Sequence, residues 1–389
     1  MKKNYLSIKN QMAFKFSILF VLFGFFVSNA QVTTNSGSGL SASYPDLATA
    51  VTALNGATIS SPVVITLTGD ETAPVGGYSI TAQGDAVNTI IIEGVTSTIT
   101  ANATLTVGAL NDAIFKLVGA DYVTIQGFTM LENPANTTTA AATNTMTEWG
   151  VALLYATTTN GAQNNTIRNN TIDLNRTYQN TFGIYCNATH TAAAPTATAS
   201  ATAGGGNSGL KVYTNAITDV NIGILVVGPT AATDHNDGID IGGASLATGN
   251  TITNYGTTGT FSGYANVSGT VNGILVRNSK NFNVSYNSVT SSNGGVTAGT
   301  LNGIQVQASS NTPTGIFTNT ITNNSISLRS GFITGAMNGI TYPSGSASTT
   351  STLNVNNNDF NNFGHTVAGT AAITFITIAS TNQFASVNN

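Results

Sequence analysis

Short runs of alternating apolar and polar residues recur along this chain, and most of them follow a glycine. The most regular runs read Asn-Gly-Ile at 272–274, 302–304 and 338–340, and looser copies have their glycine at 150, 183 and 223. In the run from Gly273 to Val276, Ile274 and Val276 would point to one side of a strand and Leu275 to the other. Successive glycines are 33, 40, 50, 30 and 36 residues apart. This uneven spacing disfavours a helical repeat and favours a solenoid of short strands, in which extra residues leave as corner loops.

Stacking one coil on the next would bring the residue after each glycine into one column of the core, with rungs about 4.8 Å apart. The predicted column consists of Val151, Ile184, Ile224, Ile274, Ile304 and Ile340. The residues before three of the glycines are Asn272, Asn302 and Asn338. Amide side chains stacked in register can bond from coil to coil, so we predict an asparagine ladder there. The alternative is that they are polar turn residues.

A second phrase, Asn-x-Ile or Asn-x-Val, follows most copies of the first. It begins at Asn165, Asn215, Asn250, Asn287 and Asn319. With both phrases, the chain from about residue 114 to 360 resembles right-handed parallel β-helix proteins of the pectin-lyase-like type, and 121–128 resembles an early coil of that family. We therefore predict an all-β fold, a right-handed parallel β-helix solenoid with a short N-terminal capping helix. The resemblance identifies a fold rather than an activity.

The strongest helix signal covers Ser43–Asn55, with Ser43 as the cap, Pro45 in the first turn and Gly56 at the end. Its apolar face would close the open end of the solenoid. We predict a capping segment over 31–60 and the β-helix over 61–389. The first strands are expected at Val63–Leu67, Thr89–Glu93 and Ile114–Leu117. A strand at 372–378 is followed by no polar capping repeat, so we expect the solenoid to continue beyond residue 389. The alternative is that a partner closes the last coil.

Residues 1–30 have the pattern of a secretory signal peptide. Lysines precede an apolar run from Phe16 to Val27, and Ser28 and Ala30 are the small residues before the cleavage site. A retained membrane anchor is the alternative, but the run is short for a membrane span. We expect a secreted or bacterial cell-surface protein with no transmembrane segment after signal cleavage. The segment 44–65 also resembles the start of large repetitive surface proteins of Bacteroidetes.

Charge excludes one class of partner. Without residues 1–30 the chain keeps seven Lys and Arg against fifteen Asp and Glu, a net charge of −8. Nucleic-acid binding needs basic clusters, so we expect no nucleic acid as a partner. Cys186 is the single cysteine and lies two residues after Ile184. This position predicts a buried thiol on the inner side of its strand rather than a nucleophile.

A polysaccharide lyase or glycoside hydrolase on this fold would need carboxylates and often a basic residue on an exposed strand face. The predicted outward column of the glycine-led strands contains Tyr185, Leu225, Leu275, Gln305 and Thr341, and the next outward positions include Arg277 and Gln307. Neither set contains a carboxylate. We therefore name no catalytic residue, and the sequence favours a protein without catalysis.

The segment 234–240 contains an acidic cluster with an asparagine and a turn glycine. Oxygen ligands from Asp234, Asn236, Asp237 and Asp240 could bind Ca²⁺. The alternative is a solvated loop of ordinary turn-forming residues. No other cofactor is expected.

Three aromatic residues are candidates for stacking on sugar rings: Trp149, Tyr155 and Tyr185. The alternative is packing beneath the corner loops, which is the commoner role of aromatic side chains. The sequence thus predicts a non-catalytic β-helix, adhesin-like or structural, with an extracellular polysaccharide or cell-surface glycan as its partner. The alternative function is a secreted polysaccharide lyase or glycoside hydrolase.

Overall fold

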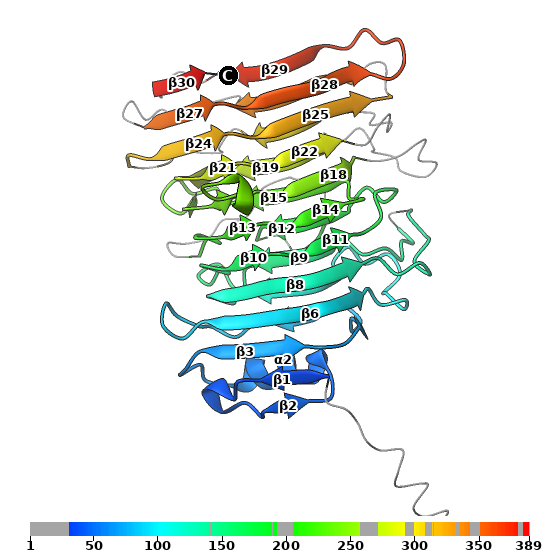
Figure 1. The fold of residues 1–389 in the computed structure, drawn as a ribbon, viewed down its shortest axis with the longest axis vertical. Helices are drawn as coiled ribbons and strands as arrows, with labels where there is room; N and C mark the ends of the chain where they lie inside the picture. Colours follow the sequence, from blue (N-terminus) through cyan, green and yellow to red (C-terminus); the bar gives the residue numbers. More distant parts are fainter. Residues whose placement is uncertain are drawn as a thin grey trace, which may run out of the picture.

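The structure is a computed structural model that describes residues 31–140, 142–188, 190–192, 205–256, 271–291, 299–307, 313, 315–331, 335–342, 351–379 and 384–388. The predicted signal peptide lies outside these residues. The described strands stack along one long axis, from β2 at the blue end to β29 and β30 at the red end (Figure 1). From coil to coil the strands pair in parallel, so the chain folds as a parallel β-helix.

Each coil contributes strands to three faces. The first face contains β3 (Val63–Leu67), the start of β6 (Ile90–Thr100), the start of β8 (Val123–Leu131), β10 (Thr166–Arg168), β13 (Lys211–Tyr213), β17 (Asp240–Ile241), β21 (Asn283–Ser285), β24 (Thr318–Thr322), β27 (Thr352–Asn356) and β30 (Phe384–Asn388). The second face contains β4 (Glu71–Thr72), the ends of β6 and β8, β11 (Thr171–Asp173), β14 (Ala216–Thr218), β18 (Thr251–Tyr255), β22 (Ser288–Ser291), β25 (Ser325–Ser330) and β28 (Asp359–His365). The third face contains β5 (Tyr78–Ile80), β7 (Ala113–Val118), β9 (Trp149–Leu154), β12 (Phe182–Cys186), β15 (Ile222–Val227), β19 (Val271–Arg277), β23 (Leu301–Val306), β26 (Met337–Tyr342) and β29 (Ile373–Ile378).

The glycine-led phrases form the third face in the predicted register. Ile184 pairs with Val151 and Ile224, and Ile304 pairs with Ile274 and Ile340. All six residues of the predicted column are fully buried. The predicted strands at Val63–Leu67, Thr89–Glu93 and Ile114–Leu117 correspond to β3, β6 and β7, although β6 runs on to Thr100.

The glycine of each phrase is required by close packing across the core. A Cβ added to Gly303 would lie 2.5 Å from Cγ2 of Ile326 and 2.7 Å from the carbonyl oxygen of Gly339. The same contact recurs in other coils, joining Gly150 to Ile172, Gly183 to Ile217, Gly223 to Ile252 and Gly273 to Val289. Each of these third-face glycines thus receives the apolar side chain of a second-face strand, and for Gly183, Gly223 and Gly273 that side chain belongs to a second phrase identified in the sequence.

The predicted asparagine ladder on the third face is confirmed. Nδ2 of Asn302 donates to Oδ1 of Asn272 over 2.9 Å, and Nδ2 of Asn338 donates to Oδ1 of Asn302 over 2.9 Å. Asn272 and Asn302 are fully or almost fully buried. The side-chain oxygens of Asn272 and Asn302 are therefore partnered inside the solenoid, so these residues are more than polar turn residues, while Nδ2 of Asn272 has no hydrogen-bond partner among the described residues.

A second, longer asparagine ladder runs along the corner between the first and second faces. Its members are Asn170, Asn215, Asn250, Asn287, Asn324 and Asn358. Oδ1 of each of the last five accepts both the backbone N–H and Nδ2 of the member one coil earlier. Of the phrases identified in the sequence, Asn165 and Asn319 lie instead at the start of the first face.

The N-terminal end is closed by β1 (Val32–Thr34), β2 (Ser43–Tyr44) and α2 (Leu47–Gly56), with short 3-10 turns at η1 (Gly37–Gly39) and, later in the chain, η2 (Leu246–Thr248). Strand β1 pairs antiparallel with β3 and covers its edge. Leu47, Val51 and Leu54 of the helix are buried in the solenoid core, as predicted for a lid.

The predicted start of the helix was wrong. Ser43 and Tyr44 pair with β1 as strand β2, so the chain is still extended there. Asp46 caps the helix instead, because its carboxylate accepts the N–H of Thr49 over 2.7 Å. An aspartate at the N-terminus also suits the positive end of the helix dipole.

Candidate functional site

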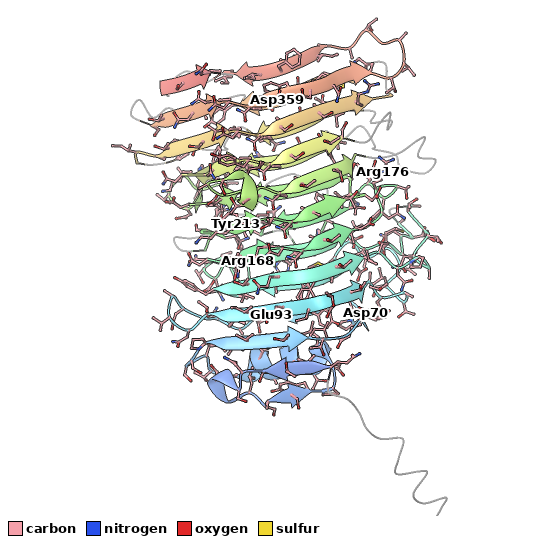
Figure 2. All side chains as sticks on the ribbon, in the orientation of Figure 1. Asp70, Glu93, Arg168, Arg176, Tyr213 and Asp359 are labelled. Atoms are coloured by element: carbon pink, nitrogen blue, oxygen red, sulfur yellow. The ribbon has the colours of Figure 1, made fainter. Side chains whose placement is uncertain are left out.

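A row of polar side chains crosses consecutive coils of the first face, on the outer side of the strands. Glu93, Gln126, Arg168 and Tyr213 are neighbours in register. Nε2 of Gln126 donates to Glu93 over 2.7 Å, and Nε of Arg168 donates to Oε1 of Gln126 over 2.7 Å. Figure 2 shows Glu93, Arg168 and Tyr213 one above another on this side of the solenoid. The sheet thus presents a continuous polar stripe to solvent, which we call the first-face row.

The first-face row contains one exposed cation, Arg168, and a second lies beside the row. Lys211 is exposed on the next coil, in register with Thr166. Tyr213 is half-buried beside them, and its hydroxyl donates to Oδ2 of Asp240 over 2.5 Å. Asn283 then donates to the other carboxylate oxygen over 2.7 Å. These contacts hold the Tyr213 hydroxyl against Asp240, on the strand that also carries Lys211 and next to the strand of Arg168.

A second candidate site is a pocket of about 480 Å³ where strands β8 and β11 end, which we call the corner pocket. It is lined by Leu131, Glu132, Asn133, Pro134, Asn136, Thr137, Asp173, Leu174 and Asn175. This volume lies in the range of small-molecule sites. Burial and the nearby Asp219 raise the pKa of the Asp173 carboxyl.

Glu132 anchors the loop that forms one wall of the corner pocket. Its Oε1 accepts from the N–H of Asn133, Nδ2 of Asn136 and Oγ1 of Thr147, and its Oε2 accepts the N–H of Thr147. Burial raises the pKa of this carboxyl, although the hydrogen bonds oppose the shift. With both oxygens engaged, Glu132 holds the two ends of the loop together.

Two more acids lie buried near Glu132. Oε2 of Glu148 accepts the N–H of Asp112 over 2.8 Å, and Oε1 contacts the hydroxyl of Tyr178 at 2.6 Å. Burial raises the pKa of Glu148 to about 9 and that of Asp112 to about 6. Glu148 is therefore protonated at neutral pH and connects the segments around Asp112 and Tyr178 without a net charge.

The stability of the fold should fall as pH rises, because Glu148 must lose its proton in a buried site. Its folded pKa lies above the unfolded value, so the stabilisation is complete below about pH 4.5 and is lost as pH rises through about 9. Each unit of pKa difference is worth about 1.4 kcal/mol. We expect the melting temperature to fall between pH 6 and pH 9.5, and Glu148→Gln to reduce the slope, since Gln can keep both contacts. An equal slope in parent and variant, measured by differential scanning fluorimetry, would show that another group causes it.

Two of the four predicted calcium ligands, Asp237 and Asp240, are engaged by other side chains. Asp237 is paired with Lys280 at 3.6 Å and accepts Nδ2 of Asn281, whereas Asp240 lies in β17 and binds Tyr213 and Asn283. Asn236 is buried in a small sheet of β16 (Asn236–Asp237) and β20 (Ser279–Lys280). Among the described residues, no group of three His, Cys, Asp or Glu side chains is placed to hold a metal ion.

The three aromatic residues proposed for sugar stacking are buried. Trp149, Tyr155 and Tyr185 are 0, 5 and 1% exposed. Trp149 and Tyr185 stack on each other with ring centroids 4.9 Å apart, in a second apolar cluster that includes Leu225, Leu275 and Ala192. The structure therefore shows the packing alternative, because the ring faces that a sugar would need are already covered.

The outward column of the third face has the predicted register from Tyr185 to Thr341. Much of it is nevertheless buried, since a second apolar cluster lies outside the sheet. Cys186 points inward and is fully buried, as predicted, and burial raises the pKa of its thiol to about 12. A thiol that stays protonated at neutral pH is a poor nucleophile.

Neither candidate site was predicted from the sequence. The outward columns predicted above belong to the glycine-led strands, whereas Glu93 and Arg168 lie on the first face. A signal was present, because Thr166 and Arg168 flank the inward Ile167 of an Asn-x-Ile phrase. The corner pocket had no such signal, since its two walls come from non-periodic segments more than thirty residues apart in sequence.

Comparisons with known proteins add little to the geometry. No protein-family model and no curated protein matches the chain. A solved structure, the mannuronan C-5 epimerase A-module of Azotobacter vinelandii, is similar at 13% identity over 85% of this chain and 96% of that chain, with a TM-score of 0.34. A similarity this low carries no argument about activity, so the fold assignment rests on the strand registers. Across the described residues, no helix has the length and hydropathy that a membrane span requires.

Proposed function

We propose that the protein is a secreted or cell-surface β-helix that binds a glycan without catalysis, as an adhesin-like or structural rod. The first-face row supports this proposal. Arg168 and Lys211 offer charged hydrogen-bond donors, and Tyr213 offers an aromatic ring on the same stretch of the surface. Neighbouring coils are about 4.8 Å apart, so an extended polymer lying along the axis would meet a polar group at each step. The signal-like N-terminal pattern supports export.

Replacing Arg168 with Ala should weaken glycan binding about tenfold, because a hydrogen bond from a charged donor is worth about 1.5–3 kcal/mol. The measurement is calorimetric titration with a panel that contains pectin, alginate and neutral glucans. Arg329→Ala on β25 of the second face is the matched control and should bind as the parent does. Equal weakening by both variants, or no binding to any member of the panel, would reject the first-face row as the binding site.

A polysaccharide lyase or glycoside hydrolase is the second candidate function. The observation that favours it is the pair of carboxyls in the corner pocket, Glu132 and Asp173, whose pKa values are both raised. Raised carboxyl pKa values are a property of general acids. Appearance of unsaturated products or new reducing ends on the same panel, abolished by Asp173→Asn, would establish this function in place of binding alone.

A further inference from the structure

The outer side of the second face carries hydroxyl groups in two columns that run along the solenoid, which we call the hydroxyl array. Strand pairing keeps the first column in register from β6 to β25, and its hydroxyl residues are Thr98, Thr129, Thr171, Thr251, Ser288 and Ser325. The second column lies two residues further along each strand, with hydroxyls at Thr100, Thr218, Thr253, Thr290 and Ser327. Ala216 interrupts the first column, and Leu131 and Asp173 interrupt the second. Figure 1 shows the strands of the array, from β8 to β25, one above another.

The hydroxyl array is open to solvent. Each of its Thr and Ser residues is exposed or half-buried. Within the described residues, the hydroxyls of Thr171, Thr251 and Ser325 make no hydrogen bond to the protein. On the first face, by contrast, side chains of neighbouring coils bond to each other, as Ser285 does to Thr322. The outer side of the third face is covered by the second apolar cluster. The second face is therefore the one whose hydroxyls are left to bind water.

The spacing of the hydroxyl array is regular in two directions. Coils repeat about every 4.8 Å along the solenoid, and residues two apart in a parallel strand are about 6.6 Å apart. Both spacings are close to repeats between oxygen atoms on a prism face of ice. Threonine is β-branched and has few χ1 rotamers, so its hydroxyl and methyl groups keep a restricted orientation from coil to coil. A surface fixed in this way can order water molecules at a small entropic cost.

The composition of the two columns favours ice over a polysaccharide as the ligand. From β6 to β28 the columns contain no aromatic residue, no lysine and no arginine. Stacking on a sugar ring uses an aromatic face, and binding a carboxylated sugar uses a cation. The charges in the columns are the carboxylates Asp173 and Asp359. Ice has neither a charged group nor a ring face to offer, so a largely neutral array of hydroxyls with a matching period suits it.

We propose that the second face binds ice, with the hydroxyl array held to a prism face through ordered water. This inference does not rest on glycan binding, because the array shares no residue with the first-face row. Adsorption along the length of the solenoid would place many weak contacts on one crystal plane. The adsorbed protein would then stop growth of the crystal at that plane.

The test is thermal hysteresis of the whole protein, measured by nanolitre osmometry, together with the shape of ice crystals grown in its presence. The parent should hold a crystal without growth below its melting point and should facet it. Thr251→Tyr should abolish both effects, because a ring in the middle of the first column would keep the neighbouring hydroxyls away from the ice surface. Its circular dichroism should match that of the parent, since Thr251 is exposed.

Thr320→Tyr is the matched control, because Thr320 lies on the outer side of β24 on the first face, between Asn283 and Asn354 in register. It should keep the full hysteresis, and so should Arg168→Ala, which separates the hydroxyl array from the first-face row. The proposal is overturned if the parent neither shapes ice nor shows hysteresis, or if Thr251→Tyr is as active as Thr320→Tyr. Retention of the parent on crystalline cellulose or chitin that Thr251→Tyr loses, without activity on ice, would overturn it in favour of a polysaccharide surface.

Discussion

Replacing Ile274 with Asp should lower the free energy of unfolding by about 4 kcal/mol or more. Ile274 is fully buried and lies between Ile224 and Ile304 in the core column. A carboxylate at this position would have apolar neighbours above and below it, so it would be desolvated without gaining a partner. Urea denaturation followed by circular dichroism measures the change.

Thr251→Asp is the control for this experiment. Thr251 lies in β18 on the outer side of the second face and is exposed, between Ala216 and Ser288 in register. The same new charge should change the stability there by about 0.5 kcal/mol or less. If the two variants unfold at the same urea concentration, the assigned inward register of the third face is wrong.

Replacing Asn287 with Ala should lower the free energy of unfolding by about 2–4 kcal/mol, although only a small polar side chain is lost. Oδ1 of Asn287 accepts the backbone N–H and Nδ2 of Asn250, and its Nδ2 donates to the carbonyl oxygen of Ile241 and to Asn324. The truncation leaves several buried groups without partners, each at a cost of about 1–3 kcal/mol before relaxation. Thermal and urea unfolding of the purified variant measure the loss.

Asn354→Ala provides the matching control, because Asn354 lies on the outer side of β27 and is partly exposed. Its truncation should change the stability by about 0.5 kcal/mol or less. If Asn287→Ala loses no more stability than this, water can replace the hydrogen bonds of the asparagine ladder at the corner between the first and second faces.

Much of the fold could be predicted from the sequence because the third face repeats a single local phrase. Alternation identifies Ile274 as inward and Leu275 as outward, and stacking then follows from the repetition of the phrase. The N-terminal helix was also predictable from its apolar face. Its first residue was not, since both Ser43 and Asp46 are good caps and the choice depends on a tertiary partner, strand β1.

The sequence does not predict which asparagines form the ladder at the corner between the first and second faces, because one coil can contain the same phrase twice. Asn165 and Asn170 both begin Asn-Thr-Ile, and Asn319 and Asn324 both precede an apolar residue by two positions. Only the positions of the turns decide which asparagine is stacked. Residue Asn169 has a φ of 54° and Asn323 a φ of 57°, and each places the following asparagine at the corner.

The candidate sites depend on contacts that a linear pattern does not contain. Glu148 precedes a third-face strand and looks like an ordinary polar residue in sequence. Its high pKa arises from burial beneath segments that contribute Asp112 and Tyr178, which lie 36 residues before it and 30 after it. Burial by loops without periodicity is a property of the folded chain, so the perturbed carboxyls were found only in the structure.

The contact between each third-face glycine and a second-face side chain also bears on ancestry. The contact joins the second and third faces of the solenoid at one point and places no constraint on the length of the corner loops. Successive glycines can therefore lie 30 to 50 residues apart. Insertions and deletions in the loops would be nearly neutral, whereas a change at the contact would be selected against. Descendants of one such solenoid could keep every one of these contacts while their sequences became too different in length to align. Their common origin would then be easier to detect by comparing structures than by comparing sequences.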